Sequence, residues 1–596
     1  MRVADHVVKA LADRGVDTVF TVAGGHIGPL LDALGQEPRI KVVCCHHEQA
    51  CAIAAEEYAR VSGKVGVCLV TAGPGVLNAL SGVFGAWTDS VPVLVISGQC
   101  RTETIDEDYE LRQLGDQEVN AARVVRLLVK SFSELNREHW LWNLTLAMRR
   151  CVQGRPGPCW LEIPVDVQSA EADPQMLQME AESYQRAPFK EQVVAWCRQT
   201  VAMLREAKRP VILVGSGVRI AGATEQLAKL ATRLGVPVVT AWAVDTIASD
   251  HPCFVGRQGT IGDRAGNWAV QYSDLLLVIG SRLSIRQVSY NWQNFAPRAK
   301  KVWVDIDPAE LVKPTVKPGL PICCDAKVFL DEMLRQTTED RWLPEARVDW
   351  LAKCKRWRRD YPVVLPRHRE HQGDGINHYH FLDTLWECLA DDDVVVCGNS
   401  TATVATIQVA KIRGSQRLLS NSGSAAMGWD LPAAVGAAIA RKGKRVVCVT
   451  GDGSIMMNLQ ELATIAHHRL PVKIFVLCNG GYASIRESQT RLFGRVVGAD
   501  ERSGVMLPNM IQVARTFGIE ATEVEHEGME YRIQNVIRPG KQGPVLCVVQ
   551  CDPKQGIEPR VESRRLPDGT METGTLEDMA PRLPREELSA VLEGLR

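Results

Sequence analysis

The stretch that decides the fold is RVVCVTGDGSIMMNLQELATIAHHRLPVKIFVLCNGGY, residues 445–482. It opens with an apolar run of strand length at 446–450, which Gly-Asp-Gly-Ser then interrupts. Apolar residues recur at helical spacing from Asn458, and Pro471 closes that segment. A second apolar run covers 472–477 and ends in Cys-Asn-Gly-Gly. The stretch therefore predicts a strand, a helix and a second strand.

Asp452 and Asn479 each follow the carboxyl end of one predicted strand. A strand–helix–strand crossover makes the two strands parallel, so both ends meet at one sheet edge, where open α/β sheets bind ligands. Carboxylate and amide oxygens suit Mg²⁺, which often bridges to a phosphate. Gly451 and Gly453 admit a close backbone approach, and the helix N-terminus expected after Ser454 favours an anion. The predicted ligand is a metal diphosphate.

A lone Gly-Asp-Gly also marks ordinary turns, but here a second strand ends in Asn-Gly-Gly at the right distance. The stretch resembles the thiamin diphosphate (ThDP) signature, Gly-Asp-Gly followed after a helix by Asn-Asn. In that family the Asp, the second Asn and a carbonyl two residues later hold the metal, which implies Asp452, Asn479 and Gly481. The chain departs from the signature at Cys478, where the family has the first Asn. The resemblance also implies cofactor contacts at the flanking residues Gly451, Gly453, Ser454 and Tyr482.

The composition indicates a soluble globular protein of several domains. The chain has 596 residues, 45% apolar and 23% charged, which is too long for one core and predicts three or four domains. A net charge of −1 gives no basic surface for nucleic acid or an anionic membrane. We expect no signal peptide and no membrane span. The 18 cysteines include adjacent pairs and form no C-x-x-C, so a reduced, cytoplasmic compartment fits best.

The N-terminal part alternates strand-like runs, at 18–22, 40–45, 65–71 and 92–97, with helical patterns. This alternation predicts a parallel sheet covered on both faces. Glu48 follows the second run in the sequence His-His-Glu-Gln-Ala-Cys, where a zinc protease would need His in place of Cys. Taken alone, Glu48 is a residue that favours the positive end of a helix.

Two segments of this part, HHEQACAIAAEEYARVSGK and LVTAGPGVLNALSGVFGAWTDSVPVLVISGQ, resemble the first domain of acetolactate synthase-type ThDP enzymes. In that family the Glu hydrogen-bonds N1′ of the aminopyrimidine and favours the tautomer that deprotonates the thiazolium, which implies Glu48 as the catalytic acid/base. The resemblance implies Gly73 and Asn78 near the pyrimidine. Gln117 matches the Gln of the synthases' Phe-Gln-Glu, whereas Asp116 replaces the Phe.

His26 is an additional titratable group at the end of the first predicted strand, in Gly-Gly-His-Ile. The synthases have a small residue at that position. A lone His is often structural, so both a structural and a catalytic role remain open.

The middle part carries strand-like runs that end in Gly215, in Gly280 and at Asp305. It resembles the middle domain of the same family, which holds FAD in some members and nothing in others. The synthases' Arg-Phe-Asp-Asp-Arg stands here as Arg-Leu-Ser-Ile-Arg at 282–286, without either carboxylate. FAD therefore stays an open alternative.

The third part begins with a helix expected at 378–389 and a strand at 394–397. The resemblance implies that the residues after the strand meet the diphosphate: Gly398, Asn399 and Ser400. It implies that Ala425 offers its carbonyl to the 4′-amino group and that Met427 wedges between the cofactor rings. A Met buried in the core is the alternative. Ser488 stands where the synthases carry a Trp that crowds the acceptor pocket.

These observations predict an α/β protein with three doubly wound parallel-sheet domains. We expect the N-terminal pyrimidine-binding (PYR) domain at 1–175, the middle domain at 191–340, the C-terminal diphosphate-binding (PP) domain at 376–551 and a polar tail at 552–596. The polar stretches at 168–190 and 340–375 read as linkers.

The family places Glu48 and Asp452 of one active site in different subunits, which implies a homodimer or homotetramer. The resemblance implies decarboxylation of a 2-oxo acid, pyruvate by expectation, and ligation of the acyl unit to a carbonyl acceptor. The segments around Glu48 and Gln117 look more like carboligases of sugar and polysaccharide gene clusters, so a bulky ketone or ketosugar is one candidate acceptor. The alternatives are a 2-hydroxyacyl-CoA lyase or C–C hydrolase of the same fold, and a ThDP-binding regulatory protein without turnover.

Overall fold

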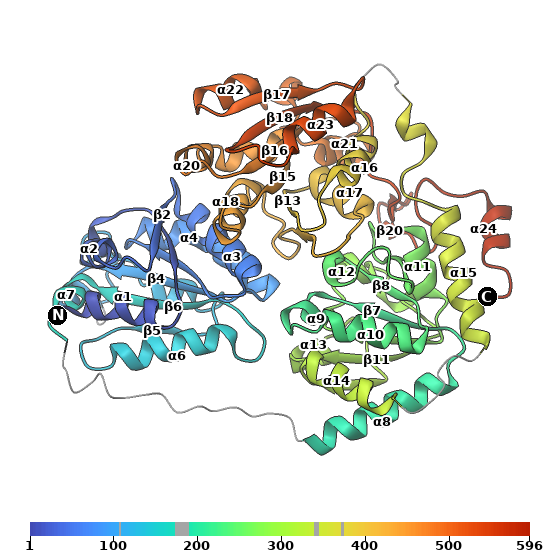
Figure 1. The fold of residues 1–596 in the computed structure, drawn as a ribbon, viewed down its shortest axis with the longest axis horizontal. Coiled ribbons are helices and arrows are strands. Elements are labelled where there is room, and N and C mark those ends of the chain that lie inside the picture. The colour runs from blue at the N-terminus through green and yellow to red at the C-terminus, as the bar shows by residue number, and fades with distance from the viewer. Residues whose placement is uncertain (107–108, 173–189, 339–344, 371–374, 596) are drawn as a thin grey trace.

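The computed structural model describes residues 1–106, 109–172, 190–338, 345–370 and 375–595. Three six-stranded sheets follow one another along this part of the chain, and every pairing within them is parallel (Figure 1). Helices connect the strands and cover the sheets on both faces. The prediction of an α/β protein with three parallel-sheet domains is confirmed. The domain boundaries stay predictions.

The first and third sheets share one plan. Their strand orders are β2-β1-β3-β4-β6-β5 and β14-β13-β15-β16-β18-β17, so corresponding strands occupy corresponding places. The strands of the first sheet are β1 (Thr18–Thr21), β2 (Lys41–Cys44), β3 (Gly66–Val70), β4 (Val93–Gln99), β5 (Phe132–Glu134) and β6 (Cys159–Pro164). Those of the third are β13 (Val394–Cys397), β14 (Arg417–Leu419), β15 (Val446–Gly451), β16 (Val472–Cys478), β17 (Glu520–Val524) and β18 (Val545–Gln550).

The middle sheet has the order β12-β11-β10-β7-β8-β9, in which the strand order reverses between β10 and β7. Its strands are β7 (Pro210–Val214), β8 (Val238–Thr240), β9 (Phe254–Arg257), β10 (Leu275–Ile279), β11 (Lys300–Asp305) and β12 (Leu320–Cys323). Such a reversal is where open α/β sheets offer a ligand crevice. Here the loops after β7 and β10 contact each other directly, because Gly217 N–H donates to the Gly280 carbonyl at 3.0 Å.

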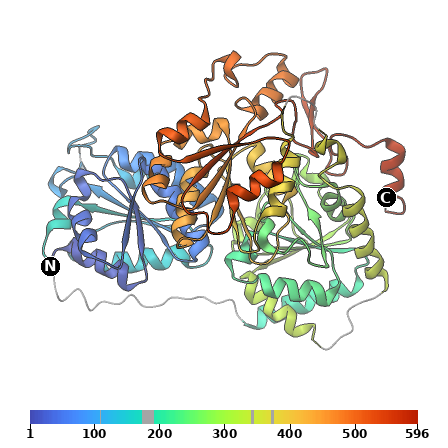
Figure 2. The same ribbon diagram turned by 45° about the horizontal axis from the view of Figure 1, so that its top comes forward.

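The first and third domains are joined by two helices, α3 (Glu48–Ser62) and α18 (Asp430–Ala440). A Cβ on Gly436 of α18 would lie 2.1 Å from the Ala54 carbonyl oxygen of α3, so the two helix backbones touch. The small residues of α3 are buried against α18 on one side and against β3 and α4 (Pro74–Asp89) on the other. The domains lie side by side in both views (Figure 1 and Figure 2). This packing carries the first residue of α3, Glu48, to the edge of the third domain.

The segment at 340–375 was expected to be a linker, and this was wrong for its described part. Residues 345–360 form helix α15 (Glu345–Asp360), whose Trp350, Cys354 and Trp357 are buried in the middle-domain core. A helix with an apolar face packed into a core is part of a folded domain, whereas a linker exposes its side chains to solvent. Most of the other expected linker, 173–189, lies outside the described residues.

The C-terminal tail is polar in composition, but it also contributes to a core. Leu576, Leu588 and Leu592 are buried with α15 against the middle domain. The tail contains a hairpin, β19 (Ser563–Arg565) with β20 (Met571–Thr573), and helix α24 (Arg585–Val591). Figure 1 shows it in red beside the middle domain. The tail therefore runs from the third domain back onto the second.

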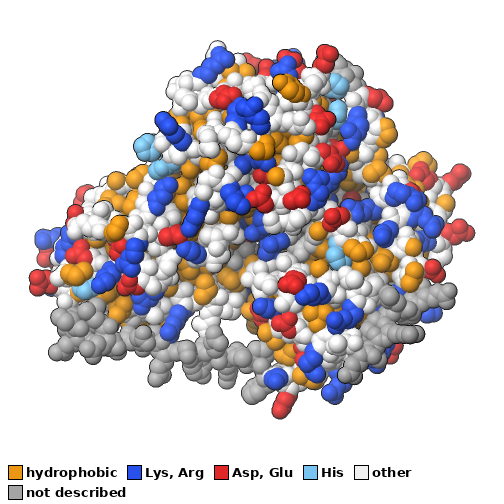
Figure 3. Space-filling model, viewed as in Figure 1, with side chains coloured by type: hydrophobic (Ala, Val, Ile, Leu, Met, Phe, Trp, Pro, Cys, Tyr) orange, Lys and Arg blue, Asp and Glu red, His pale blue; other side chains and the backbone are white. Residues whose placement is uncertain are grey.

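The surface mixes charges of both signs. On the face in Figure 3, Lys and Arg side chains alternate with Asp and Glu over all three domains. None of the helices in the described ranges has the length and apolar character that crossing a membrane requires.

The remaining helices of eight or more residues cover the sheets and close the loops: α1 (Val3–Asp13), α2 (Gly28–Gln36), α6 (Trp140–Val152), α8 (Lys190–Glu206), α10 (Thr224–Leu234), α11 (Arg264–Gln271), α14 (Ala326–Gln336), α16 (His378–Cys388), α17 (Thr401–Val409), α21 (Ala483–Phe493) and α23 (Met529–Ile537).

Candidate active site

The carboxyl ends of β15 and β16 meet at Asp452, as the sequence predicts. The Asp452 carboxylate accepts N–H groups from Gly453 and Gly480 at 2.9 Å each, and from Gly481 at 3.2 and 3.3 Å. The loop after β16 is thus folded around this one side chain. Burial raises the pKa of the Asp452 carboxyl, and the N–H donors oppose that rise. A divalent cation beside the carboxylate would favour its charged form.

Asn479 lies in the same loop and has an unused acceptor. In the described part of the chain its side-chain oxygen is buried without a hydrogen-bond partner. An orphaned buried acceptor is costly unless a ligand satisfies it. Gly481 has φ of 108°, and a Cβ there would lie 2.4 Å from the Ala499 carbonyl, so only glycine fits. Asp452, Asn479 and Gly481 thus bring a carboxylate, an amide and a backbone carbonyl to one loop pair, the oxygen donors that Mg²⁺ requires.

The first helical turn after Asp452 starts earlier than expected. Helix α19 (Asp452–Ile455) begins at the aspartate itself and continues as a 3₁₀ turn before α20 (Glu461–His467). Gly451 faces open space, because a Cβ there meets no atom within 4 Å. Gly453 packs against the ring of Tyr482, where a Cβ would come within 2.5 Å. Gly453 and Tyr482, two of the expected cofactor contacts, therefore touch each other, and Gly451 borders the open space beside them.

Ser454 is held from within the protein. Its hydroxyl donates to Asp430 at 2.7 Å and accepts the N–H of Gly428 at 3.0 Å. Asp430 is fully buried, and burial raises the pKa of its carboxyl. Sequence reasoning missed Asp430, for which the one signal was an acidic residue opening an otherwise apolar helix. Ser454 thus links the turn after β15 to Asp430 and to the loop before α18.

The loop after β13 and the loop before α18 contact each other. The Asn399 amide donates to the Ala425 carbonyl, and the Ser400 hydroxyl is hydrogen-bonded to that of Ser484. A Cβ on Gly398 would lie 2.4 Å from the Asp430 carboxylate, so glycine is required there. The structure thus brings Gly398, Asn399 and Ser400 to the loop that carries Ala425.

Met427 is 39% exposed, which excludes the alternative of a core methionine. It stands out from the loop before α18, beside Met457, which is 43% exposed. A Cβ on the intervening Gly428 would meet Met457 at 2.4 Å. Two flexible apolar side chains at this place suit a contact with a ring system.

Glu48 opens helix α3 directly after its N-cap residue, His47. The Asn78 amide of α4 donates to Glu48 Oε2 at 2.9 Å, and Glu48 Oε1 lies 3.6 Å from where a Cβ on Gly75 would be. A glycine at 75 therefore leaves room above the carboxylate. Sequence analysis expected Glu48 and Asn78 at the cofactor, and the structure brings them into direct contact.

Gln117 and Gly73 also meet. Gly73 has φ of 58°, and a Cβ there would lie 2.5 Å from the Gln117 carbonyl. Asp116 and Gln117 are both exposed at this turn. His26 lies in the turn that follows β1, the strand next to β3. Its backbone carbonyl accepts a hydrogen bond from Gln168 Nε2 at 2.7 Å. Its ring Nδ1 is buried without a partner among the described residues. His26 thus has a spare ring nitrogen, which leaves its role open.

Two half-sites result. Glu48, Asn78, Gly73 and Gln117 form one on the first domain, and Asp452 with its loop forms the other on the third. In the described part of the chain no hydrogen bond joins Glu48 to that loop. Close to Glu48, the two domains are instead linked by Glu461, a residue that sequence reasoning missed, which accepts the His46 N–H at 2.9 Å.

Three family models match the chain in order. They are the thiamine pyrophosphate enzyme N-terminal TPP binding domain at residues 1–122, its central domain at 197–333 and its C-terminal TPP binding domain at 397–549. Thiamine pyrophosphate is ThDP. The chain belongs to the thiamine pyrophosphate enzyme family. It is an acetolactate synthase-like member, because its relatives match over nearly its whole length.

Among those relatives are two from Escherichia coli (strain K12). The chain is 31% identical to "Acetolactate synthase isozyme 1 large subunit" over 94% of this chain and 95% of that protein. It is 33% identical to the isozyme 2 large subunit over 97% of this chain and 100% of that protein. "Acetolactate synthase, chloroplastic" of Arabidopsis thaliana is 32% identical over 94% of this chain and 83% of its own length.

The residues of both half-sites fit the family's cofactor. The orphaned Asn479 oxygen, the Asp452 carboxylate and the open space at Gly451 match a metal-bound diphosphate. The exposed Met427 and the accessible Glu48 match an aminopyrimidine at the other end. The expectation of a ThDP enzyme of the acetolactate synthase type is confirmed.

Proposed function

We propose that this enzyme uses ThDP and Mg²⁺ to decarboxylate a 2-oxo acid, pyruvate, and to join the acyl unit to a carbonyl acceptor. The observation that supports this proposal most directly is the Asp452 carboxylate, around which the loop with Asn479 and Gly481 folds. When bound, ThDP supplies the nucleophilic carbon and the electron sink of this chemistry. Asp452, Asn479 and the Gly481 carbonyl would hold the metal that anchors the diphosphate.

Glu48 would hold a proton at N1′ of the aminopyrimidine. The Asn78 amide, at 2.9 Å from one carboxylate oxygen, orients the side chain and leaves the other oxygen free for the ring. Gln117, brought against Gly73, would line the substrate side. Met427 would hold the pyrimidine end at its angle, and the Ala425 carbonyl would accept from the 4′-amino group.

The direct experiment measures CO₂ release from pyruvate and identifies the products. We expect release only with both ThDP and Mg²⁺, and loss of release when a chelator strips the metal. Retained ThDP binding with no turnover of any 2-oxo acid would favour the regulatory alternative. Cleavage of a 2-hydroxyacyl-CoA or of a C–C bond without pyruvate turnover would favour the lyase or hydrolase, in which the spare nitrogen of His26 would take part.

We propose that the active site forms between subunits of a homodimer, which a homotetramer would contain twice. The support is an apolar face on α4, the helix that carries Asn78. Leu77 is 48% exposed, Phe84 40% and Trp87 39%, and their spacing places them on one side of the helix. Three large apolar side chains exposed together favour an interface. In the proposed dimer a second copy covers this face and places its third domain at Glu48.

The acceptor is proposed to be larger and more polar than pyruvate, such as a bulky ketone or ketosugar. Ser488 of α21 is half-buried, and its hydroxyl donates to the Ile485 carbonyl at 3.0 Å. Together with the exposed Asp116, it replaces two aromatic side chains of the synthases and leaves room for hydroxyl groups. The tail lies close, since the Arg491 side chain of α21 donates to the Ser563 carbonyl at 2.8 Å, and could refill the space.

Product analysis tests the acceptor. Pyruvate with a bulky ketone should give a branched tertiary alcohol faster than pyruvate alone gives acetolactate. Ser488→Trp should depress the first reaction more than the second, because a filled pocket discriminates by steric exclusion. Acetolactate as the dominant product, with the ketones unreacted, would contradict the proposal.

We also propose that the middle domain binds FAD without using it for net redox chemistry. The support is the family likeness of this domain, together with two buried side-chain oxygens that lack partners in the described part of the chain, those of Thr240 and Gln258. Both lie at the carboxyl ends of neighbouring strands, β8 and β9. Protein that stays colourless after purification and incubation with FAD would contradict this.

A further inference from the structure

The loop at 421–428, between β14 and α18, carries two of the proposed cofactor contacts, Ala425 and Met427. Its first residue, Asn421, fixes its conformation through hydrogen bonds. The Asn421 side-chain oxygen accepts the N–H of Ser424 at 3.0 Å and that of Ala425 at 3.2 Å. The Asn421 backbone carbonyl accepts the Ala425 N–H as well, at 2.8 Å. The conformation of the loop therefore depends on where the Asn421 amide is held.

Glu56 of α3, in the first domain, holds that amide. The Asn421 Nδ2 lies 3.4 Å from each carboxylate oxygen of Glu56, and the Trp429 indole N–H, just past the loop, donates to Glu56 Oε2 at 3.2 Å. Glu56 is fully buried, and burial raises the pKa of its carboxyl. Arg60, one turn along α3, pairs with Glu56 and lies 3.0 Å from Asp89. One carboxylate thus binds both ends of the loop.

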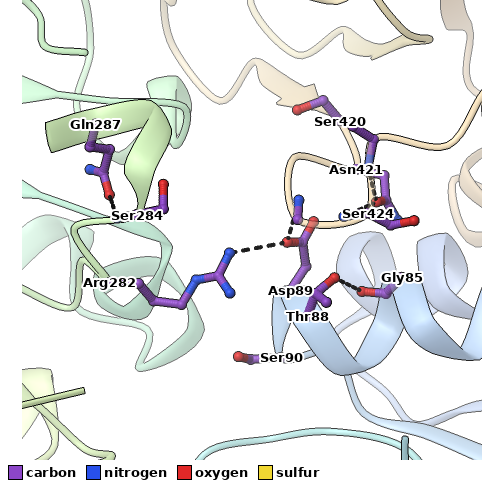
Figure 4. A network of polar contacts seen from close by, with 12 residues as sticks. Gly85, Thr88, Asp89, Ser90, Arg282, Ser284, Gln287, Ser420, Asn421 and Ser424 are labelled. Carbon is purple, nitrogen blue, oxygen red and sulfur yellow. Dashed lines mark hydrogen bonds and ion pairs between the residues drawn. The ribbon is translucent and has the colours of Figure 1, made fainter. Parts of the chain in front are cut away.

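Asp89, at the end of α4, supports the middle of the loop (Figure 4). Its Oδ1 accepts the Gly423 N–H at 3.0 Å, and a Cβ on Gly423 would come within 2.6 Å of that oxygen. Arg282 of the middle domain points at the same oxygen from 3.9 Å. Figure 4 shows the three domains meeting here, with Asp89 between Arg282 and the loop. Two carboxylates of the first domain therefore hold the loop of the third.

The loop needs holding because Ala425 is strained. Its φ of 53° lies in the left-handed region, which a residue with a Cβ rarely adopts and glycine adopts freely. We propose that Glu56 is a positioning residue, which keeps Ala425 and Met427 in their cofactor-binding conformation through Asn421 and Trp429. The inference rests on the proposed function only in that the ligand is ThDP.

Two neighbouring residues of α3 give a matched pair of variants. Glu56→Gln removes the charge and points an amide at existing donors, so the dissociation constant of ThDP should rise about tenfold or more. Glu57 is equally buried, but its carboxylate oxygens have no hydrogen-bond partner in the described part of the chain. Glu57→Gln makes the same carboxyl-to-amide replacement one residue along and leaves the hydrogen bonds of the loop in place, so ThDP affinity should stay within about twofold.

The measurement is calorimetric titration of the full-length protein with ThDP and Mg²⁺, together with near-ultraviolet circular dichroism of the bound aminopyrimidine. Ala425→Gly in the Glu56→Gln background should restore most of the affinity and the dichroism, since glycine adopts the left-handed conformation without being held. A merely structural defect would not be rescued this way.

Equal ThDP affinity in the Glu56→Gln variant and the parent overturns the inference, as does an equal loss in Glu57→Gln. If Glu56→Gln does not fold, Asn421→Ala decides, because it removes the loop's contact and keeps the carboxylate. Unchanged affinity in Asn421→Ala then overturns the inference, and weakened affinity supports it. Failure of the parent protein itself to bind ThDP would instead contradict the proposed function.

Discussion

Among the described residues, Asn78 makes the one side-chain hydrogen bond to Glu48, at 2.9 Å, and the other carboxylate oxygen accepts none. Asp452, in contrast, is surrounded by three backbone N–H groups and sits at the base of a closed loop. The difference fits their proposed tasks. A proton-transferring group needs access to its partner, whereas a metal ligand needs a fixed position.

We predict that Glu48→Gln keeps ThDP binding and loses activity by about 100-fold or more, because an amide cannot exchange the proton at N1′. Steady-state CO₂ release and calorimetric ThDP binding measure the two effects separately. Asn78→Ala should show a smaller loss of activity, since the carboxylate remains but is no longer oriented. A Glu48→Gln enzyme with parental turnover would exclude Glu48 as the acid/base.

Helices α3 and α18 pack with their backbones in contact, and glycine makes this contact possible. Gly66, Gly82 and Gly436 each face α3 at distances where a Cβ would overlap its atoms. The alanine-rich sequence of α3 follows from this crowding on three sides, which leaves no room for longer side chains. The first turn of α3 carries Glu48 and its third turn carries Glu56, so the packing fixes both.

We predict that Gly436→Ala lowers the free energy of unfolding by about 1–3 kcal/mol, because its Cβ would lie 2.1 Å from the Ala54 carbonyl. Chemical denaturation measures the change. Gly35, in helix α2, is the control, since a Cβ there meets nothing within 4 Å. Gly35→Ala should be neutral or stabilise by about 0.5–1 kcal/mol. Equal effects of the two substitutions would argue against a close α3–α18 contact.

At the scale of the whole molecule, the two half-sites lie on different domains, and we have proposed that a second copy brings them together. We predict that mixing Glu48→Gln and Asp452→Ala subunits restores activity. Each mixed dimer would contain one site with both defects and one intact site, so random pairing returns about a quarter of parental activity. Co-expression followed by assay of purified dimers measures this. Variants that stay inactive after subunit exchange, shown by a tag on each, would mean that one chain supplies both residues.

Charges also meet where the three domains join. Glu57 is fully buried beside Arg60, and burial raises the pKa of its carboxyl to about 8, against an ordinary value of 4.5. The folded state therefore keeps a proton that the unfolded state releases. Stability is greatest below the unfolded pKa and falls as pH rises towards 8, at up to about 1.4 kcal/mol per pH unit from this group.

We predict that Glu57→Gln removes this dependence, so that the variant gains stability over the parent as pH rises from 5 to 8. Denaturant titrations at several pH values measure the difference. Glu162, whose pKa burial also raises to about 8, contributes a slope of the same sign in both proteins and cancels in the comparison. Parallel stability curves for the two proteins would show that Glu57 titrates normally.

The sequence by itself determined the local chemistry. The two apolar runs around Gly-Asp-Gly predicted β15, β16 and the meeting of Asp452 with the loop of Asn479, because strand periodicity and a short crossover leave one arrangement. The family resemblance supplied Glu48 and Asn78, which the structure brings into contact, and their role at the cofactor stays a prediction. The helix after Gly-Asp-Gly began earlier than predicted, at Asp452, because propensity does not fix a helix end that a neighbouring loop caps.

Only the tertiary structure decided which polar residues hold these pieces in place. Glu56, Asp430 and Glu461 look like ordinary helix residues in sequence, yet each is buried and bonded to a segment far along the chain. The charged stretch at 340–375 was expected to be a linker, although Trp350 and Trp357 bury its helix α15 in the middle-domain core. The physical reason is the same in each case: a buried hydrogen bond or apolar contact depends on partners outside the local segment, from 24 residues away for Asp430 to 415 for Glu461, and no local pattern records them.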